Sequence, residues 1–252
     1  MKVIEYLHSK LRLEKLHMTL IDPEKQGPEE CGDIANAAYR AGTDAIMVGG
    51  STGISYDNLD ESITAMITKV PIPIIQFPSH SEALSPNADA IYFMSLLNSK
   101  DTRYIIGEQA NAAPYLRNMD VETISMGYVI VEPGMKVAEM GGAEPLKREA
   151  LESAVGFGLA AEFLGMELFY LEAGSGAPEP VPANMVSAVA NKLSIPLIVG
   201  GGIREPEAAQ KIAAAGADIL VTGTVVEENH DVEYVLREIV KAIKGKGRTH
   251  RF

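Results

Sequence analysis

The stretch LIVGGGIREPEAAQKIAAAGADILVTGT, residues 197–224, places a helical pattern between two apolar runs. The runs at 197–199 and 219–221 are apolar throughout, which is typical of parallel strands buried on both faces. The helical pattern at 205–215 ends at Gly216, and glycine suits the left-handed cap of a helix. The stretch therefore predicts a strand–helix–strand unit with parallel strands.

This unit recurs along the chain. Two further joints, Ala41-Gly42-Thr43-Asp44 and Pro86-Asn87-Ala88-Asp89, resemble Ala215-Gly216-Ala217-Asp218, and an apolar run follows each at once. Strands are expected at 17–21, 45–48, 72–76, 90–93, 122–131, 167–171, 197–199 and 219–221. Helices are expected at 1–13, 29–41, 57–69, 103–118, 150–164, 182–192, 205–215 and 231–244.

Eight strands in 252 residues predict one domain over residues 1–252 with an α/β fold, a (β/α)8 TIM barrel. The alternative is an open, doubly wound sheet. An extra helix is expected before the first strand. Residues 132–148 contain several glycines and prolines and interrupt the alternation, so they are expected to form a long loop over the active face.

Composition excludes several classes of partner. The net charge of −12 disfavours nucleic acid and anionic lipid headgroups, so any anionic ligand needs a local binding feature. No signal-peptide core occurs near the N-terminus, and no apolar run reaches the roughly 18 residues of a membrane span. We expect a cytoplasmic protein without a transmembrane segment. The single cysteine, Cys31, is expected to be a buried structural thiol.

Glycine-rich stretches follow the last three predicted strands. They are Tyr170-Leu171-Glu172-Ala173-Gly174-Ser175-Gly176, Gly200-Gly201-Gly202-Ile203-Arg204 and Gly223-Thr224, where a short helix is expected to begin. Glycine lets backbone N–H groups approach a ligand closely, and barrels often bind phosphate after strands seven and eight. The pattern predicts a phosphate site, without a lysine, at Gly201, Gly202, Gly223 and Thr224. Arg204 either contacts the phosphate or pairs with an acid at the helix start.

Glu172 is the strongest candidate for a chemical role. It stands at the end of a predicted strand, where a buried carboxylate needs a partner. A ligand hydroxyl is one such partner, and an ion pair with Arg204 or Lys136 is the alternative. Tyr170, two residues earlier, lies on the same face of the strand.

Asp22 and Ser51 follow the first and second predicted strands, so they are expected to lie close together on the same rim. A carboxylate and a hydroxyl suit Mg²⁺, with substrate phosphates completing the coordination. The alternative is structural, with Asp22 capping the turn before Pro23 and Ser51 capping the next helix.

A family resemblance covers essentially the whole chain. It rests on motifs that occur together and in order: Asp22-Pro23, Gly49-Gly50-Ser51, Ser95-Leu96-Leu97-Asn98-Ser99, Gly127-Tyr128-Val129-Ile130-Val131-Glu132-Pro133-Gly134, Tyr170 to Gly176, and Gly200-Gly201-Gly202-Ile203. The sequence resembles the archaeal geranylgeranylglyceryl phosphate synthases and the related bacterial heptaprenylglyceryl phosphate synthases. The Glu-Pro-Gly continuation is more similar to the archaeal branch.

The resemblance implies a prenyltransferase that joins geranylgeranyl diphosphate to the 3-hydroxyl of sn-glycerol 1-phosphate and releases diphosphate. It implies Mg²⁺ at Asp22 and Ser51, and a homo-oligomer, either a dimer or a hexamer. Glycerol phosphate is expected at Tyr170, Leu171, Glu172, Ala173, Gly174, Ser175, Gly176, Gly201, Gly202, Gly223 and Thr224. Catalysis is expected at Glu172, which would orient the hydroxyl and accept its proton, and at Tyr170.

The prenyl tail needs an apolar trench, and the sequence does not fix its length. Candidate lining residues are Met94, Leu96, Leu97, Met126, Tyr128 and Val129. Two other functions remain open: an isomerase or cofactor-ring synthase acting on another phosphate ester, and a non-catalytic binder of a phosphorylated metabolite.

Overall fold

Eight parallel strands form a closed barrel in sequence order, and the last strand pairs with the first. The computed structural model describes residues 1–50, 55–78, 80–81, 83–228 and 231–244. The strands are β1 (Leu16–Ile21), β2 (Ala45–Val48), β3 (Ile74–Gln76), β4 (Ala90–Leu96), β5 (Glu122–Ile130), β6 (Leu168–Glu172), β7 (Leu197–Gly200) and β8 (Ile219–Thr222). The prediction of a TIM barrel is confirmed, and the open sheet is wrong.

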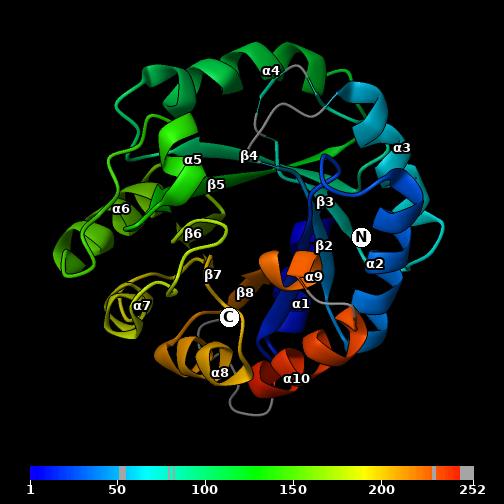
Figure 1. Ribbon diagram of the computed structural model, residues 1–252. Helices are drawn as coiled ribbons and strands as arrows, with labels where there is room; N and C mark the ends of the chain where they lie inside the picture. The colour runs from blue at the N-terminus through cyan, green and yellow to red at the C-terminus, as the bar shows by residue number, and fades with distance from the viewer. Residues whose placement is uncertain (51–54, 79, 82, 229–230, 245–252) are drawn as a thin grey trace.

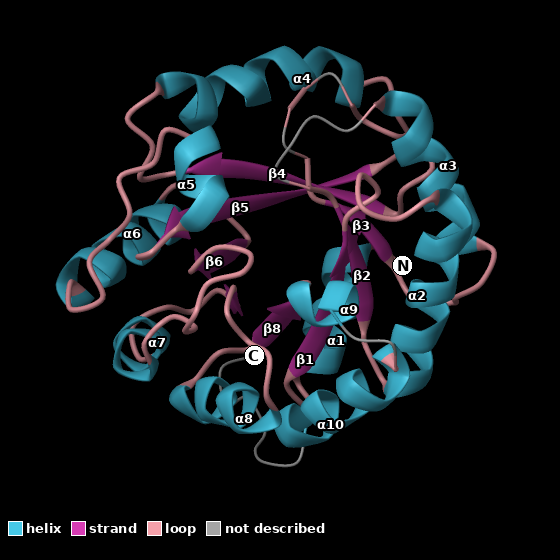
Figure 2. Cartoon of the chain, viewed as in Figure 1, coloured by secondary structure: helices cyan, strands magenta, loops and turns pink. Residues whose placement is uncertain are grey.

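Helices surround the strands (Figures 1 and 2). In chain order they are α1 (Val3–Leu11), α2 (Pro28–Ala41), α3 (Tyr56–Ile67), the π-helical turn η1 (Arg103–Gly107), α4 (Glu108–Leu116), α5 (Met135–Met140), α6 (Leu151–Phe163), α7 (Ala183–Ala190), α8 (Pro206–Ala215), α9 (Thr224–Glu228) and α10 (Val232–Lys244). In the view of Figure 1, α1 lies behind the barrel and α9 in front of it. In the part of the chain that the structure describes, no helix is long and apolar enough to cross a membrane.

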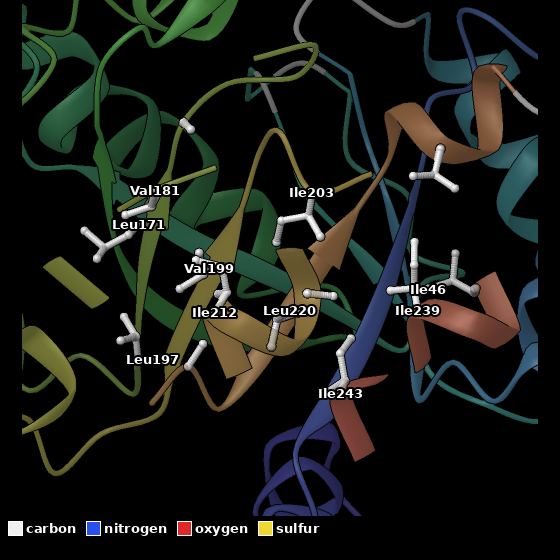
Figure 3. Packing of buried hydrophobic residues seen from close by; sticks show 14 of the residues in the cluster. Ile46, Leu171, Val181, Leu197, Val199, Ile203, Ile212, Leu220, Ile239 and Ile243 are labelled. Carbon is white, nitrogen blue, oxygen red and sulfur yellow. The ribbon is translucent and has the colours of Figure 1, made fainter. Parts of the chain in front are cut away.

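The core has two layers because each buried strand has two apolar faces. The outer layer packs strand residues such as Val199 and Leu220 against Ile212 of α8 and Ile239 of α10 (Figure 3). The inner layer fills the barrel, and α1 adds Leu7 and two further apolar residues to it. Burying one such aliphatic side chain contributes roughly 1.5–3 kcal/mol.

The aspartates of the three recurring joints have one shared task. Asp44 accepts a hydrogen bond from the backbone N–H of His17, and Asp89 accepts one from that of Ile74. Asp218 does the same for Leu197, at 2.9 Å. In each case the aspartate just before one strand accepts a hydrogen bond from a backbone N–H near the start of a neighbouring strand. These joints therefore link neighbouring strands at the N-terminal end of the barrel.

The connection from β3 to β4 departs from the expected pattern. Its described residues form no helix, so the joint before Asp89 follows a loop rather than a helix. The segment 132–148, expected as a loop, contains α5. The predicted helix at 103–118 is the π-helical turn η1 followed by α4. Strand β4 runs to Leu96, three residues beyond the predicted end.

Cys31 is buried in α2, as expected. Burial raises the pKa of its thiol to about 11, so the thiol stays protonated and unreactive near neutral pH.

Candidate functional site

A mostly apolar cavity opens where the strands end. Asp22 after β1, Gly49 and Gly50 after β2, Phe77 after β3 and Glu172 at the end of β6 all line it. Barrel enzymes place their active sites at this end of the strands. The cavity is therefore the candidate functional site.

The cavity passes over strand β4 from the barrel interior to the outer layer. Tyr92 and Met94 belong to the inner apolar layer, whereas Ile91 and Phe93 pack with α4, and all four line the cavity. Leu84, Ala112 and Leu116 line the part that lies beside α4, which we call the apolar arm. The described residues between β3 and β4 form no helix, and the arm lies between β4 and α4.

Glu172 is buried between the apolar cavity and the glycine-rich loops. Its Oε1 accepts a hydrogen bond of 2.6 Å from the backbone N–H of Gly174. The Tyr170 hydroxyl donates a second hydrogen bond to the carboxylate. Burial raises the pKa of Glu172, and these two donors partly offset that rise. The carboxylate thus has hydrogen-bond donors that favour its charge.

The ion-pair alternative for Glu172 receives no support. Arg204 donates to the backbone carbonyl of Ala177 at 2.6 Å. The charge of Lys136 acts on Asp22, lowering its pKa. Neither cation contributes to the pKa of Glu172, which is set by burial, Tyr170 and Gly174.

The three glycine-rich loops meet above Glu172. The Thr224 hydroxyl accepts a 3.2 Å hydrogen bond from the N–H of Gly176 and lies 3.4 Å from the Ser175 hydroxyl. Gly201 has a φ of +80°, and a Cβ there would overlap the Glu172 carboxylate and the N–H of Gly174. We call this group, Gly174–Gly176 with Gly201, Gly202, Gly223 and Thr224, the polar cup. The expected helix does begin at Thr224.

Two predicted contact residues point away from the cup. Leu171 and Ala173 are fully buried in the outer apolar layer. The N–H of Ala173 donates to the carbonyl of Gly200, which joins β6 to β7. Their side chains therefore hold the strand in place, and only their backbone lies beside the cup.

Asp22 has both a structural and a cavity-facing role. Its Oδ1 accepts a 3.1 Å hydrogen bond from the N–H of Glu24, as the capping alternative predicted. Its Oδ2 lies 3.9 Å from Nζ of Lys25, which also contacts Glu227 at 2.7 Å. Burial raises the pKa of Asp22, and the Glu24 N–H and Lys25 lower it.

The second predicted metal residue, Ser51, lies outside the described residues. Its neighbour Gly50 approaches Asp22 so closely that a Cβ there would overlap the carboxylate. The expected proximity of the two rim segments is therefore found as far as the structure describes them. Within that part of the chain, no cluster of three His, Cys, Asp or Glu side chains is arranged to hold a metal ion.

The Ser-Leu-Leu-Asn-Ser motif holds the segment with α5 over the barrel. The side-chain amide of Asn98 donates to the carbonyls of Ile130 and Glu144, at 2.9 and 2.8 Å. The Ser99 hydroxyl donates to the carbonyl of Gly141 at 2.7 Å. Gly141 itself lines the cavity, so the motif shapes the site through hydrogen bonds to the backbone.

Half of the proposed trench residues line the cavity: Met94, Leu96 and Tyr128 do, whereas Leu97, Met126 and Val129 pack in the core. Leu97 and Val129 lie on the outer faces of their strands, whereas Met126 faces inward like Tyr128 but comes two residues earlier in β5. Sequence reasoning missed Phe77, Lys25 and Glu227, which also line the cavity. Lys25 could have been recognised from the sequence as a site residue, because it comes three residues after Asp22. The α4 residues line the cavity only through tertiary packing, which the sequence pattern does not show.

The fold and the site define a class of protein: a TIM barrel in which a glycine-rich polar cup adjoins a mostly apolar cavity. A family model described as the PcrB family matches residues 9–243, and the chain belongs to this family.

Known relatives match along nearly their full length. Geranylgeranylglyceryl phosphate synthase of Methanothermobacter thermautotrophicus is 51% identical over 96% of this chain and 99% of its own. The enzyme of that name from Picrophilus torridus is 49% identical over 96% of this chain and 100% of its own. The crystal structure of (S)-3-O-geranylgeranylglyceryl phosphate synthase from Thermoplasma acidophilum, in complex with sn-glycerol-1-phosphate, superposes with a TM-score of 0.95. It is 48% identical and covers 98% of this chain and 100% of its own.

Proposed function

We propose that this chain is a prenyltransferase that joins geranylgeranyl diphosphate to the 3-hydroxyl of sn-glycerol 1-phosphate. The reaction releases diphosphate and forms the first ether bond of archaeal membrane lipids. One observation carries the proposal: the buried Glu172 stands between a cup suited to phosphate and a cavity suited to an apolar chain. The relatives' names and the glycerol phosphate in the Thermoplasma acidophilum structure support it.

The polar cup is the acceptor half of this site. Glycines with positive φ at 174, 176, 201 and 202 allow a close backbone approach to phosphate oxygens. The hydroxyls of Ser175 and Thr224 supply further hydrogen bonds. With the phosphate held there, the glycerol chain extends toward Glu172 and presents its 3-hydroxyl to the carboxylate.

The apolar arm is the donor half. A prenyl chain lying in it would be covered by α4 on one side and β4 on the other. Burial of its apolar surface would supply most of the binding free energy. The reacting end of the chain would then lie at the barrel centre, close to Glu172.

The proposed reaction breaks one bond of the donor and forms one ether bond. The bond from C1 of the donor to its diphosphate oxygen breaks, and the electron pair leaves with diphosphate. The glycerol oxygen forms the new bond to C1, and Glu172 accepts its proton. The Tyr170 hydroxyl holds the carboxylate in position for this transfer.

Asp22 fits a role in holding Mg²⁺. A single cavity-facing carboxylate suits an ion that is bound mainly by substrate phosphates and water, and Ser51 is the proposed second protein ligand. Bound there, Mg²⁺ would neutralise charge on the departing diphosphate.

On the family resemblance, we also propose a homo-oligomer, dimer or hexamer, which light scattering would test.

Competing functions predict different behaviour. An isomerase or ring synthase acting on a small polar phosphate ester has no use for the apolar arm. A non-catalytic binder needs neither Asp22 nor Mg²⁺. To distinguish these functions, the protein is incubated with labelled sn-glycerol 1-phosphate, Mg²⁺ and prenyl diphosphates of several lengths. We expect a labelled product that partitions into organic solvent. No such product with any donor would disprove the synthase.

A further inference from the structure

Four aromatic rings line the cavity as one continuous group. The ring centroid of Phe77 lies 6.2 Å from that of Tyr92, 5.5 Å from that of Tyr128 and 6.1 Å from that of Tyr170. The centroids of Tyr128 and Tyr170 are 5.1 Å apart. All four residues contribute to the cavity wall. We call them the aromatic group.

The barrel fixes these rings in place. Tyr128 of β5 and Tyr170 of β6 are direct partners in the strand register. Phe77 directly follows β3, and its N–H donates to the carbonyl of Val48 at 2.8 Å. Burial raises the pKa of Tyr128 and Tyr170 well above the usual value, so both remain neutral phenols at working pH. Neutral rings in fixed positions present a constant π-electron density to the cavity.

The position of the reacting carbon follows from Glu172. The attacking hydroxyl must be within hydrogen-bonding reach of that carboxylate, and C1 must lie about 3–3.5 Å from the hydroxyl oxygen. The Tyr170 hydroxyl is itself hydrogen-bonded to Glu172, and its ring adjoins those of Tyr128 and Phe77. The carbon that becomes positive is therefore confined beside the aromatic group.

We propose that Phe77 and Tyr128 stabilise the positive charge that develops on the allylic carbons as diphosphate departs. This inference rests on the proposed function and extends it to two further residues in contact with the reacting atoms. As the C1–O bond breaks, the charge spreads from C1 to C3. The electron-rich faces of aromatic rings attract such a cation within about 6 Å of their centroids. The interaction strengthens only as charge develops, so it raises kcat more than it lowers KM.

The test compares a charged and an uncharged donor analogue. The first is a geranylgeranyl diphosphate analogue with an ammonium nitrogen at position 3; the second is the unreactive, uncharged-chain thiolodiphosphate. In Phe77→Leu we expect about tenfold weaker binding of the ammonium analogue, from a typical cation–π interaction, and little change for the second. The kcat should fall by a similar factor. Equal losses for both analogues would show that Phe77 acts only as apolar wall.

Two further measurements keep the test decisive. If Phe77→Leu is unstable, fluorinated phenylalanines at position 77 retain the ring shape while reducing its π-electron density. The affinity for the ammonium analogue should then fall with each added fluorine, and a flat series would overturn the proposal. Ile91→Val, in the same cavity wall but outside the aromatic group, is the matched control and should affect both analogues equally.

Failure of this inference is distinguishable from failure of the proposed function. An inactive wild-type protein would disprove the synthase. An active wild-type protein whose Phe77 variants show no selective loss for the ammonium analogue would disprove only the role of the rings.

Discussion

Glu172 combines burial with hydrogen-bond donors that favour its charged form. A carboxylate in this setting can accept a proton near neutral pH, because desolvation weakens its preference for ionisation. Glu172 is therefore the residue at which binding and chemistry can be separated.

Glu172→Gln keeps the size of the side chain but removes the proton acceptor. We expect kcat to fall about 100-fold or more, the usual contribution of a general base. The affinity for sn-glycerol 1-phosphate, measured by calorimetry, should change less than about threefold because the phosphate is held by the polar cup. Equal losses in both quantities would identify Glu172 as a binding residue.

The raised pKa of Glu172 also predicts a pH dependence. The base works when ionised, so kcat should fall as the pH drops through a pKa that lies above the ordinary 4.5. The measurement is a pH–rate profile at saturating substrates. The residual activity of Glu172→Gln should lack this acidic limb. A limb that persists unchanged in that variant would assign the titration to another group.

His17 is a buried histidine on the outer face of β1, held by the hydroxyls of Thr43 and Thr222 at 2.9 and 3.0 Å. Burial lowers its pKa from 6.5 to about 4. Between these values the unfolded chain binds a proton and the folded chain does not. The free energy of unfolding should therefore fall as pH drops from about 6.5 to about 4, by roughly 1.4 kcal/mol per unit at most. Urea denaturation of His17→Gln at several pH values should show a free energy of unfolding that changes less with pH than that of the wild-type protein.

At the scale of elements, Asp44 connects both ends of the chain to the barrel. Its carboxylate accepts hydrogen bonds from Lys10 of α1 at 2.7 Å and Lys244 of α10 at 2.9 Å, and from the N–H of His17 in β1. The joint that the sequence presents as a turn signal is thus also the anchor of three elements.

Asp44→Ala should lower the free energy of unfolding by about 2 kcal/mol, since it removes charged hydrogen bonds to partly exposed lysines and a buried N–H partner. Chemical denaturation measures this loss. Lys241→Ala is the control, because its pair with Glu238 is exposed on α10 and should contribute little. A loss in Asp44→Ala no larger than in the control would contradict the anchoring role.

At the scale of the molecule, the cavity continues from the barrel interior to the layer between β4 and α4. The described residues between β3 and β4 form no helix, and the apolar arm lies between β4 and α4. A donor chain can thus extend from the barrel centre to the outer layer. On the proposed function, we expect the length of this arm, rather than the polar cup, to set which prenyl donors fit.

Ala112→Phe should shorten the arm, because Ala112 of α4 is one of its lining residues. We expect KM for the twenty-carbon donor to rise about tenfold or more, as steric overlap in a packed wall costs about 1–3 kcal/mol. A ten-carbon donor should be affected far less. Ala110→Phe, on the exposed side of the same helix, is the control. If Ala112→Phe did not change the preference for donor length, the prenyl chain would not lie in the apolar arm.

The sequence by itself determined the barrel, because alternating apolar runs and helical patterns with capped joints admit few other topologies. It also located the polar cup and Glu172, since glycine loops after consecutive parallel strands must meet at one rim. The sequence did not predict α5 or the helix-free described connection from β3 to β4, because local patterns there do not decide between loop and helix.

Only the tertiary structure decided what surrounds those residues. The aromatic group brings together Phe77, Tyr92, Tyr128 and Tyr170 from four different strand regions, and the apolar arm adds residues of α4. The partner of Glu172 was likewise fixed by packing, as Tyr170 and Gly174 rather than a cation. Such contacts depend on the register and spacing of elements far apart in the chain. The physical reason is that periodicity specifies which face of an element is buried, whereas closure of the barrel specifies what that face meets.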